Sequence, residues 1–277
     1  WNIPKLLRTD ATYREAQVDW QYSAQVIRAG WNRAERPQVV VTQGFIGGTA
    51  EGLRTTLGRE GSDYTAALLG NFLDAESVTI WKDVPGILNA DPRKQTDTIK
   101  IDQLSYHDAV ELAYSGAQVI HPKTIRPLEN KKIPLYVKPF GNPLAEGSII
   151  CGNAQPVTVP VYIWRENQIL ITMRAKDFAF VLEESLSHIF EIIHRHHLTV
   201  SLVQSSAVTI SVCVDNNRFV ERAIQELQDA YLVTWNDNLR LLTIRGTTPE
   251  ILNKEQENRT ILLSQTTRRT ARLVITH

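Results

Sequence analysis

Apolar positions in the first part of the chain alternate between helical spacing and short β-branched runs. In residues 12–36 apolar side chains recur at roughly helical spacing before Pro37, so we expect a helix there. The β-branched run at 39–42 is typical of a strand buried in a parallel sheet. The same rhythm predicts helices over 64–73 and 104–117, and strands over 78–81, 133–138 and 147–151. Strands that alternate with helices in this way predict an α/β fold with a largely parallel sheet.

The pattern changes at residues 152–158, where we place a domain boundary. Beyond it we predict helices over 181–196, 216–229 and 249–255, and strands over 158–165, 168–174, 199–204, 207–214, 230–235, 239–244, 260–265 and 271–276. From 168 to 235 the order is β-α-β-β-α-β, which is the ferredoxin-like split motif. The remaining strands predict a second unit of the same kind.

Composition narrows the class of protein. Lys plus Arg and Asp plus Glu both number 30, so the formal net charge is zero, which argues against nucleic acid or an anionic membrane as a partner. No apolar run reaches the roughly 18 residues that a membrane-spanning helix needs. Cys151 and Cys213 lie far apart and in no metal-binding or redox spacing, so a reducing cytoplasm is the expected compartment.

Candidate chemistry lies in loops after predicted strands, because ligands of open α/β sheets bind at the carboxyl ends of strands. The first loop, Gly44 to Gly48, would let backbone N–H groups approach an anion, although a plain turn explains it as well. In the second loop, Arg59 and Asp63 are spaced to hold the carboxylate and the ammonium of an α-amino acid. The alternative is a salt bridge with Ser62 or Asp63 as an ordinary helix N-cap.

The third loop follows the predicted strand 78–81. Asp83 would accept hydrogen bonds from a ribose or a base, and Arg93 would meet phosphates. The alternative is a structured turn that Asp91-Pro92 begins.

Four segments in register resemble the aspartate kinases of the amino acid kinase family: VTQGFIG (41–47), TTLGREGSDYTAALL (55–69), WKDVPGILNADPR (81–93) and SGAQVIHPKT (115–124). The second half resembles the paired ACT domains of that family. The resemblance implies a partial amino-acid-kinase-like three-layer α/β sandwich over 1–155 and ferredoxin-like ACT domains over 156–277. The first ACT domain, about 168–235, would be inserted within the second, about 157–166 plus 237–277.

By this resemblance the chain would use ATP with Mg²⁺ to phosphorylate the β-carboxylate of L-aspartate. The product, 4-phospho-L-aspartate, opens the route to lysine, threonine and methionine. The implied substrate residues are Gly44, Phe45, Arg59 and Asp63, of which Asp63 would also be catalytic by orienting the substrate ammonium or a catalytic lysine. The implied nucleotide residues are Lys82, Asp83, Leu88, Arg93 and Gln118.

The chain departs from the family pattern at several positions. Leu88 stands where Tyr is frequent, Gln118 where a phosphate-contacting Lys is common, and Glu60 where a Gly is common. We interpret Glu60 as a loop variation. The family's Lys-Phe-Gly-Gly motif, with its catalytic lysine, is absent, and the chain opens at Trp1 with Met173 as its single methionine. We therefore expect a later part of a longer protein that is inactive alone.

ACT domains imply feedback by a free amino acid and a homodimer. The implied regulatory residues are Ser185, Leu186, Thr199, Val200, Ser201, Gln204, Ser205 and Ser206. Ser201 and Ala207 stand where lysine-inhibited members tend to carry acidic residues. Without those acids the ammonium of a bound lysine would be buried unpaired, which is costly. The sequence therefore leaves three possibilities for the feedback ligand: threonine, lysine or none.

The sequence also contains features that other functions would use. The run 194–197 (HRHH) lacks metal-ligand spacing, so we predict no metal site, and His121 is expected to have a structural hydrogen-bonding role. A regulatory amino-acid sensor with a kinase-like remnant is the alternative function. A nicotinamide-binding dehydrogenase is disfavoured because no Gly-x-Gly-x-x-Gly follows a strand.

Overall fold

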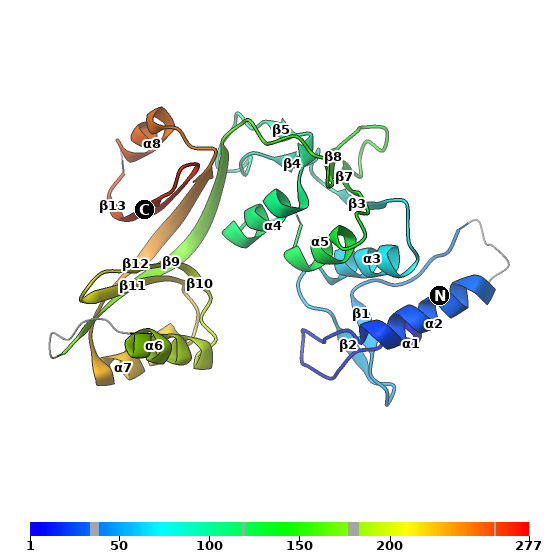
Figure 1. Ribbon diagram of the computed structural model, residues 1–277, viewed down its shortest axis with the longest axis horizontal. Coiled ribbons are helices and arrows are strands. Elements are labelled where there is room, and N and C mark those ends of the chain that lie inside the picture. The colour runs from blue at the N-terminus through cyan, green and yellow to red at the C-terminus, as the bar shows by residue number, and fades with distance from the viewer. Residues whose placement is uncertain (34–38, 118–119, 177–182, 258, 277) are drawn as a thin grey trace. The chain divides into compact units, whose positions relative to one another are not determined.

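The computed structural model describes residues 1–33, 39–117, 120–176, 183–257 and 259–276. The chain divides into two compact units, Trp1–Val159 and Pro160–His277, and each is described by itself. Figure 1 shows the elements of both.

The first unit is an α/β structure around a four-stranded sheet. Its helices are α1 (Ile3–Leu6), α2 (Trp20–Arg33), α3 (Gly61–Phe72), α4 (Tyr106–Ser115) and α5 (Pro122–Glu129). Its strands are β1 (Ile46–Gly48), β2 (Arg54–Thr56), β3 (Val78–Lys82), β4 (Ile87–Leu88), β5 (Lys100–Ile101), β6 (Gln103–Leu104), β7 (Leu135–Pro139) and β8 (Ser148–Ile150). The sheet has the order β3-β7-β8-β6, whereas β1–β2 and β4–β5 form separate pairs.

The prediction of a largely parallel sheet is wrong in one pairing. β3–β7 and β6–β8 are parallel, but β7 and β8 run antiparallel, which makes the sheet mixed. A short connection joins β7 to β8, and so short a connection permits only an antiparallel pair.

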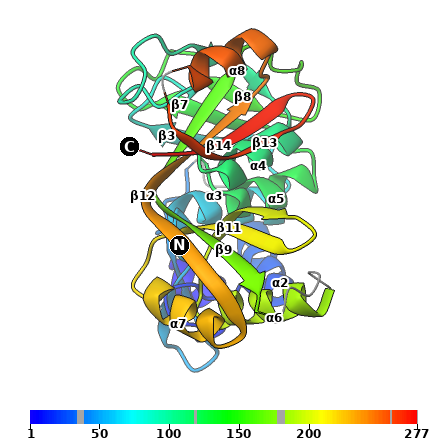
Figure 2. The ribbon, with the colours of Figure 1, turned by 90° about the vertical axis from the view of Figure 1, so that its left-hand side faces the viewer.

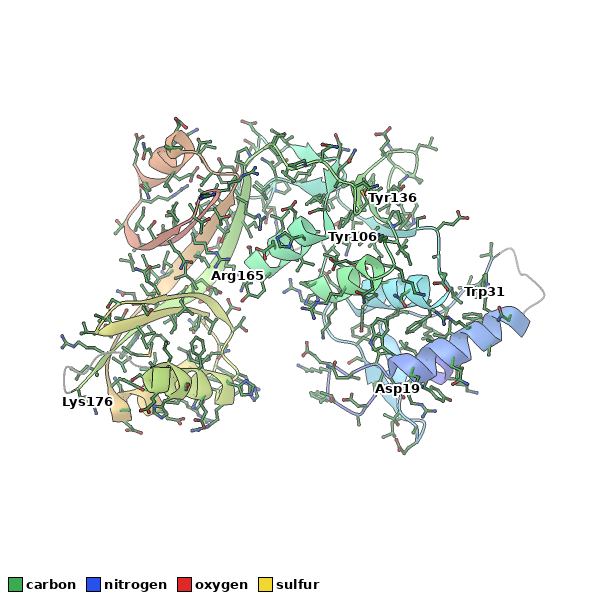
Figure 3. All side chains as sticks on the ribbon, in the orientation of Figure 1. Asp19, Trp31, Tyr106, Tyr136, Arg165 and Lys176 are labelled. Carbon is green, nitrogen blue, oxygen red and sulfur yellow. The ribbon has the colours of Figure 1, made fainter. Side chains whose placement is uncertain are left out.

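Two predicted elements near the N-terminus differ from the structure. The helix begins at Trp20 rather than at residue 12, because the Asp10 carboxylate accepts the N–H groups of Thr12 and Gln17 and holds a turn. Asp19 caps the helix by accepting the N–H of Tyr22 at 3.0 Å, and Figure 3 labels it there. Residues 39–42 form no strand, and Val39 and Val41 are each 78% exposed.

The second unit is a six-stranded antiparallel sheet with three helices. In chain order its elements are β9 (Val161–Ala175), α6 (Glu183–Arg195), β10 (Val200–Ser205), β11 (Thr209–Asp215), α7 (Val220–Ala230), β12 (Tyr231–Arg245), α8 (Pro249–Gln256), β13 (Ile261–Thr266) and β14 (Thr270–Thr276). The strand order is β10-β11-β9-β12-β14-β13. Figure 2 shows β9 and β12 as the two long strands of this unit.

Four strands that were predicted separately are halves of two long ones. The predicted pairs 158–165 with 168–174, and 230–235 with 239–244, merge into β9 and β12. Asn167 and Asn238 adopt positive φ angles of 53°, and the register between the two strands shifts between Asn236 and Leu241. Local irregularity therefore marks the middle of each strand without ending it.

Two ferredoxin-like modules share these long strands. The first module has the order β10-β11-β9-β12, and the second has β9-β12-β14-β13. Ile171 and Leu227 belong to an apolar core against α6 and α7, whereas Leu242 and Leu273 belong to a core against α8. A third core joins Leu170, Leu202, Cys213, Leu239, Leu241, Leu263 and Val274 from both modules. The predicted ferredoxin-like architecture is confirmed.

Candidate functional site

The two loops that were predicted to meet a substrate lie against each other at the start of α3. The N–H of Phe45, a residue with φ of 73°, donates to Thr65 Oγ1 at 3.0 Å. A Cβ on Gly61 would lie 2.8 Å from the ring of Phe45, and a Cβ on Gly44 would lie 3.2 Å from Ser62 Cα. Glycine at position 61 therefore permits the close approach of the two loops.

Asp63, in the first turn of α3, forms an ion pair with Lys82, the last residue of β3. Lys82 Nζ donates to Asp63 Oδ2 at 2.7 Å, and the two side chains are 23% and 12% exposed. The start of a helix favours a negative charge, which supports Asp63 at this position. The Asp63 carboxylate, which was predicted to orient a substrate ammonium or a catalytic lysine, thus accepts a hydrogen bond from the ammonium of Lys82.

Glu60 precedes this helix in the left-handed conformation, with φ of 53° and ψ of 32°. It occupies the N-cap position without a side-chain capping bond, so the predicted cap, Ser62 or Asp63, is wrong. Burial raises the pKa of the Glu60 carboxyl, the charge of Lys82 opposes this, and the charge of Asp63 adds to it. The interpretation of Glu60 as a loop variation missed its half-buried place beside Lys82 and Asp63. A charged residue where a glycine is common was the signal in the sequence.

His121 connects this region to α5. Its Nδ1 accepts the N–H of Lys123 at 3.2 Å and caps the helix, which confirms the predicted hydrogen-bonding role. Its own backbone N–H donates to the Glu60 carboxylate. Burial lowers the pKa of His121, and the charges of Lys123 and Arg59 lower it further.

The structure brings only some of the predicted nucleotide-binding residues close to one another. Asp83 is exposed directly after Lys82, and Leu88 lies half-buried in β4. The Arg93 guanidinium donates to the Asp91 carboxylate, from Nε at 3.0 Å and from Nη2 at 2.8 Å among other contacts, and this pairing lowers the pKa of the Asp91 carboxyl. Asp91 also accepts the N–H of Arg93, so the alternative prediction of a structured turn describes this loop. Gln118 lies outside the described residues.

The predicted regulatory residues lie on α6 and along β10, an edge strand of the sheet. Ser201 Oγ accepts a hydrogen bond from Arg165 Nη1 at 3.2 Å, and Arg165, labelled in Figure 3, also pairs with Asp215 at 3.7 Å. The guanidinium of Arg165 therefore lies beside Ser201, the position at which lysine-inhibited members were expected to carry an acidic residue. Gln204 and Ser205 continue β10 as exposed residues.

The other regulatory candidates make local structural contacts. Leu186 and Val200 pack against the apolar core under α6 and α7. The carbonyl of Ser185 accepts the hydroxyl of Tyr231 at 3.4 Å, and the carbonyl of Thr199 accepts the N–H of Asp215 at 3.1 Å. Ser206 closes the β10–β11 hairpin, since its N–H donates to the carbonyl of Thr209 at 2.8 Å.

The histidine-rich end of α6 contacts Glu226 of α7. His196 Nε2 lies 2.6 Å from Glu226 Oε2, and Arg195 pairs with the same carboxylate. Among the described residues no group of three or more His, Cys, Asp or Glu side chains is arranged to hold a metal ion. Within the same ranges, no helix is long and apolar enough to cross a bilayer.

Comparison with known families places this site in context. Residues 3–139 match the amino acid kinase family, and this part of the chain belongs to that family. More narrowly, the chain is a homologue of the aspartokinases. Lysine-sensitive aspartokinase 3 of Escherichia coli (strain K12) is 35% identical over 216 residues, which are 78% of this chain and 48% of that protein. Aspartokinase 1, chloroplastic, of Arabidopsis thaliana is 34% identical over 197 residues, which are 69% of this chain and 34% of that protein. The chain thus spans about half the length, or less, of these relatives.

Solved structures agree with this placement. E. coli aspartokinase III in complex with aspartate and ADP (R-state) matches with a TM-score of 0.83 and 28% identity, covering 100% of this chain and 66% of that chain. The complex of the same enzyme with lysine and aspartate (T-state) gives 0.77 and 29%, covering 100% and 65%. Aspartate kinase of Clostridium acetobutylicum, with a TM-score of 0.80 and 20% identity over 100% and 67% of the two chains, shares the fold.

Proposed function

We propose that the protein transfers the γ-phosphoryl group of ATP to the β-carboxylate of L-aspartate, giving 4-phospho-L-aspartate and ADP. The observation that carries this proposal is the charged cluster at the start of α3. There Arg59 is exposed in the loop before α3, the Asp63–Lys82 ion pair joins the first turn of that helix to β3, and Phe45 donates to Thr65 of the same helix. The homologous E. coli enzyme, whose solved structure holds aspartate and ADP, supports the choice of substrates.

Phosphoryl transfer of this kind depends on positioning and on charge neutralisation, because the protein has little covalent chemistry to perform. Arg59 binds a carboxylate of the substrate with its planar guanidinium. Gly44 and Phe45 bring their backbone to the same substrate. Asp63 acts through Lys82, whose ammonium it holds at the end of β3.

The nucleotide binds beside the same strand end. Lys82 and Asp83 contact ATP, Leu88 lines the pocket, and Arg93 with Gln118 faces the phosphates. Mg²⁺ in kinase sites is held mainly by phosphates with one or two carboxylates, and the exposed Asp83 carboxylate fits that donor set. When bound, Mg²⁺ neutralises charge on the phosphates.

The second unit regulates this activity in the proposal. Its ACT domains, about 168–235 and 157–166 plus 237–277, bind a feedback amino acid, lysine or threonine, next to β10, and pair two subunits into a homodimer. The E. coli relative is described as lysine-sensitive, which supports such regulation. The edge position of β10 supports pairing, because an edge strand offers unpaired backbone groups to a second chain. In the proposal the whole protein, with both of its units, is cytoplasmic.

The test is aspartyl-hydroxamate formation by the protein expressed from its complete reading frame. The assay contains ATP, Mg²⁺, L-aspartate and hydroxylamine, with lysine and threonine added in parallel. We expect turnover that falls at least 100-fold in Arg59→Ala, since loss of a bidentate carboxylate contact removes substrate positioning. The amino acid that inhibits turnover names the feedback ligand.

The alternative function is a non-catalytic sensor. The Asp91 partner of Arg93 favours it, because that guanidinium is already engaged. Absence of turnover, together with calorimetric binding of lysine or threonine, would replace the kinase with the sensor.

A further inference from the structure

The second unit contains a solvent-open cavity that is lined by none of the predicted site residues. Its volume is about 660 Å³, which is within the range of small-molecule sites. One side of α7, the loop before this helix, and residues of β9 and β12 line it. Figure 2 shows α7 beside these two long strands. Because β11 and β9 separate β12 from β10, the cavity is distinct from the predicted feedback site.

The buried part of the lining is apolar. Ile169, Val220 and Ile224 belong to the core under α7, and each is at most 6% exposed. Trp235 of β12 lines the same cavity with a side chain that is 48% exposed, and its indole N–H donates to no described residue. An open indole next to an apolar surface can pack against a large nonpolar group of a ligand.

An irregularity in the β9–β12 ladder lies at this cavity. The register shifts between Asn236 and Leu239, so Asp237 and Asn238 of β12 stand opposite the single residue Ile169. A bulge of this kind redirects side chains and is frequent beside functional sites. Asp237 and Ile169 both line the cavity, so the bulge brings a carboxylate to an otherwise apolar surface.

The loop before α7 is held by hydrogen bonds. The N–H of Asn216 donates to the carbonyl of Asn167 at 2.9 Å, and its side-chain amide donates to Asn167 Oδ1 at 3.1 Å. Asn217 Oδ1 accepts the N–H of Phe219 at 2.9 Å. Arg218, between these two residues, has its guanidinium carbon 4.6 Å from the centre of the Phe219 ring. The loop therefore presents a guanidinium to the cavity that it lines.

Charges of both signs line the cavity without being paired. Arg218, Glu221 and Asp237 form no ion pair within the described part of the chain. Two carboxylates and one guanidinium disfavour a polyphosphate, and a neutral ligand would bring them no counter-charge. A zwitterion with a large apolar group complements the lining, because it offers a carboxylate to the guanidinium, an ammonium to the carboxylates and a nonpolar surface to Trp235.

We propose that this cavity binds a free α-amino acid with an aromatic or large aliphatic side chain. Arg218 binds its carboxylate, Glu221 and Asp237 face its ammonium, and Trp235 packs against its side chain. All lining residues belong to the second unit, so binding can be measured whether or not the chain phosphorylates aspartate.

Titration calorimetry on the protein expressed from its complete reading frame tests the ligand class. The probes are L-phenylalanine, L-leucine, 3-phenylpropionate, which lacks the ammonium, and 2-phenylethylamine, which lacks the carboxylate. We expect saturable binding of at least one of the two amino acids at millimolar or lower concentration. Each analogue should bind about tenfold more weakly than L-phenylalanine, since it lacks one charge-assisted hydrogen bond.

Variants locate the bound amino acid. Trp235→Ala should weaken it about tenfold or more, whereas Trp235→Phe keeps an aromatic face and should retain most of the affinity. Leu232→Ala, on the opposite face of β12 and 45% exposed, is the matched control. Arg218→Gln should weaken the amino acid and 3-phenylpropionate but not 2-phenylethylamine. Arg222→Gln, exposed on α7 outside the cavity, should leave all the probes unaffected.

Two results would overturn the site. Neither amino acid might bind, or binding might survive unchanged in both Trp235→Ala and Arg218→Gln, which would place the ligand elsewhere. Thermal unfolding checks that each variant is folded, and the exposed position of Arg218 keeps Arg218→Gln informative if Trp235→Ala lowers stability. Aspartate turnover is measured separately, so the kinase proposal stands or fails independently of this one.

Discussion

Individual residues at the start of α3 form a small electrostatic system. Asp63 and Lys82 come from different elements, and their ion pair ties the first turn of α3 to the end of β3. Most of each side chain is shielded from water, so the pair is stronger than a surface salt bridge and more costly to break. The same contact that positions Lys82 therefore also stabilises the fold.

Replacing Lys82 with methionine tests this contact. Lys82→Met leaves Asp63 buried without its partner and should lower the free energy of unfolding by about 2 kcal/mol. Lys82→Arg keeps the charge and should recover most of the loss. Urea denaturation measures both variants. In the double variant with Asp63→Asn the two effects should not add, and additive losses would show that the pair is energetically unimportant.

A second prediction at the residue scale concerns pH and His121. Its pKa is lowered in the folded protein from an ordinary 6.5. Below pH 6.5 the unfolded chain therefore binds more protons than the folded one, so stability should fall as the pH drops through that value. His121→Asn retains a helix-capping acceptor and should flatten this part of the stability profile. Denaturation from pH 8 to pH 5 compares the two proteins, and identical slopes would contradict the assignment.

At the scale of elements, the sequence predicted kinds of structure better than their ends and partners. The ferredoxin-like order could be predicted because each strand and helix carries its own periodic pattern. The continuity of β9 and β12 could not be predicted, because Asn167 and Asn238 resemble turn residues. Their positive φ angles are local irregularities within a ladder. The run at 39–42 has the composition of a strand, but a strand also requires a partner, which periodicity does not reveal.

The antiparallel pairing of β7 with β8 depends on Gly147. Its φ is 70°, and a Cβ there would lie 2.2 Å from the carbonyl oxygen of Val137. Gly147→Ala should lower the free energy of unfolding by about 3 kcal/mol, from backbone strain and overpacking together. Gly30→Ala is the matched control in α2, where nothing lies within 4 Å of the added Cβ. It should raise stability by about 0.5–1 kcal/mol, because alanine is the better helix former. Equal effects of the two changes in thermal unfolding would contradict this account.

At the scale of the whole chain, the site was predictable where recognition depends on contiguous residues. Arg59 and Asp63 lie four residues apart in the sequence, and the structure brings the Gly44–Phe45 loop against the helix that carries Asp63. The Asp63–Lys82 contact and the burial of Glu60 arise from tertiary packing between segments, which spacing alone does not encode. Arg93 was assigned to phosphates, yet its own turn supplies a carboxylate two residues away.

The two modules of the second unit should lose their structure together. Leu273 is fully buried on β14 in the core against α8. Leu273→Ala should destabilise that core by about 2–5 kcal/mol. Because β9 and β12 belong to both hydrogen-bonded ladders, amide exchange should accelerate in the β10–β11 hairpin as well as in β13–β14. Unchanged exchange in β10–β11 would show that the modules open separately.

The shared strands also govern how this unit can be divided into fragments. Residues 168–236 carry a continuous β-α-β-β-α-β segment, which invites its expression as an isolated piece. Such a piece would uncover Leu170, Leu202 and Cys213, which now pack against Leu241 and Val274 of the other module. An apolar surface of that kind promotes self-association. A soluble fragment would therefore need polar substitutions at these positions, whereas cutting at the boundary between the two compact units leaves this core intact.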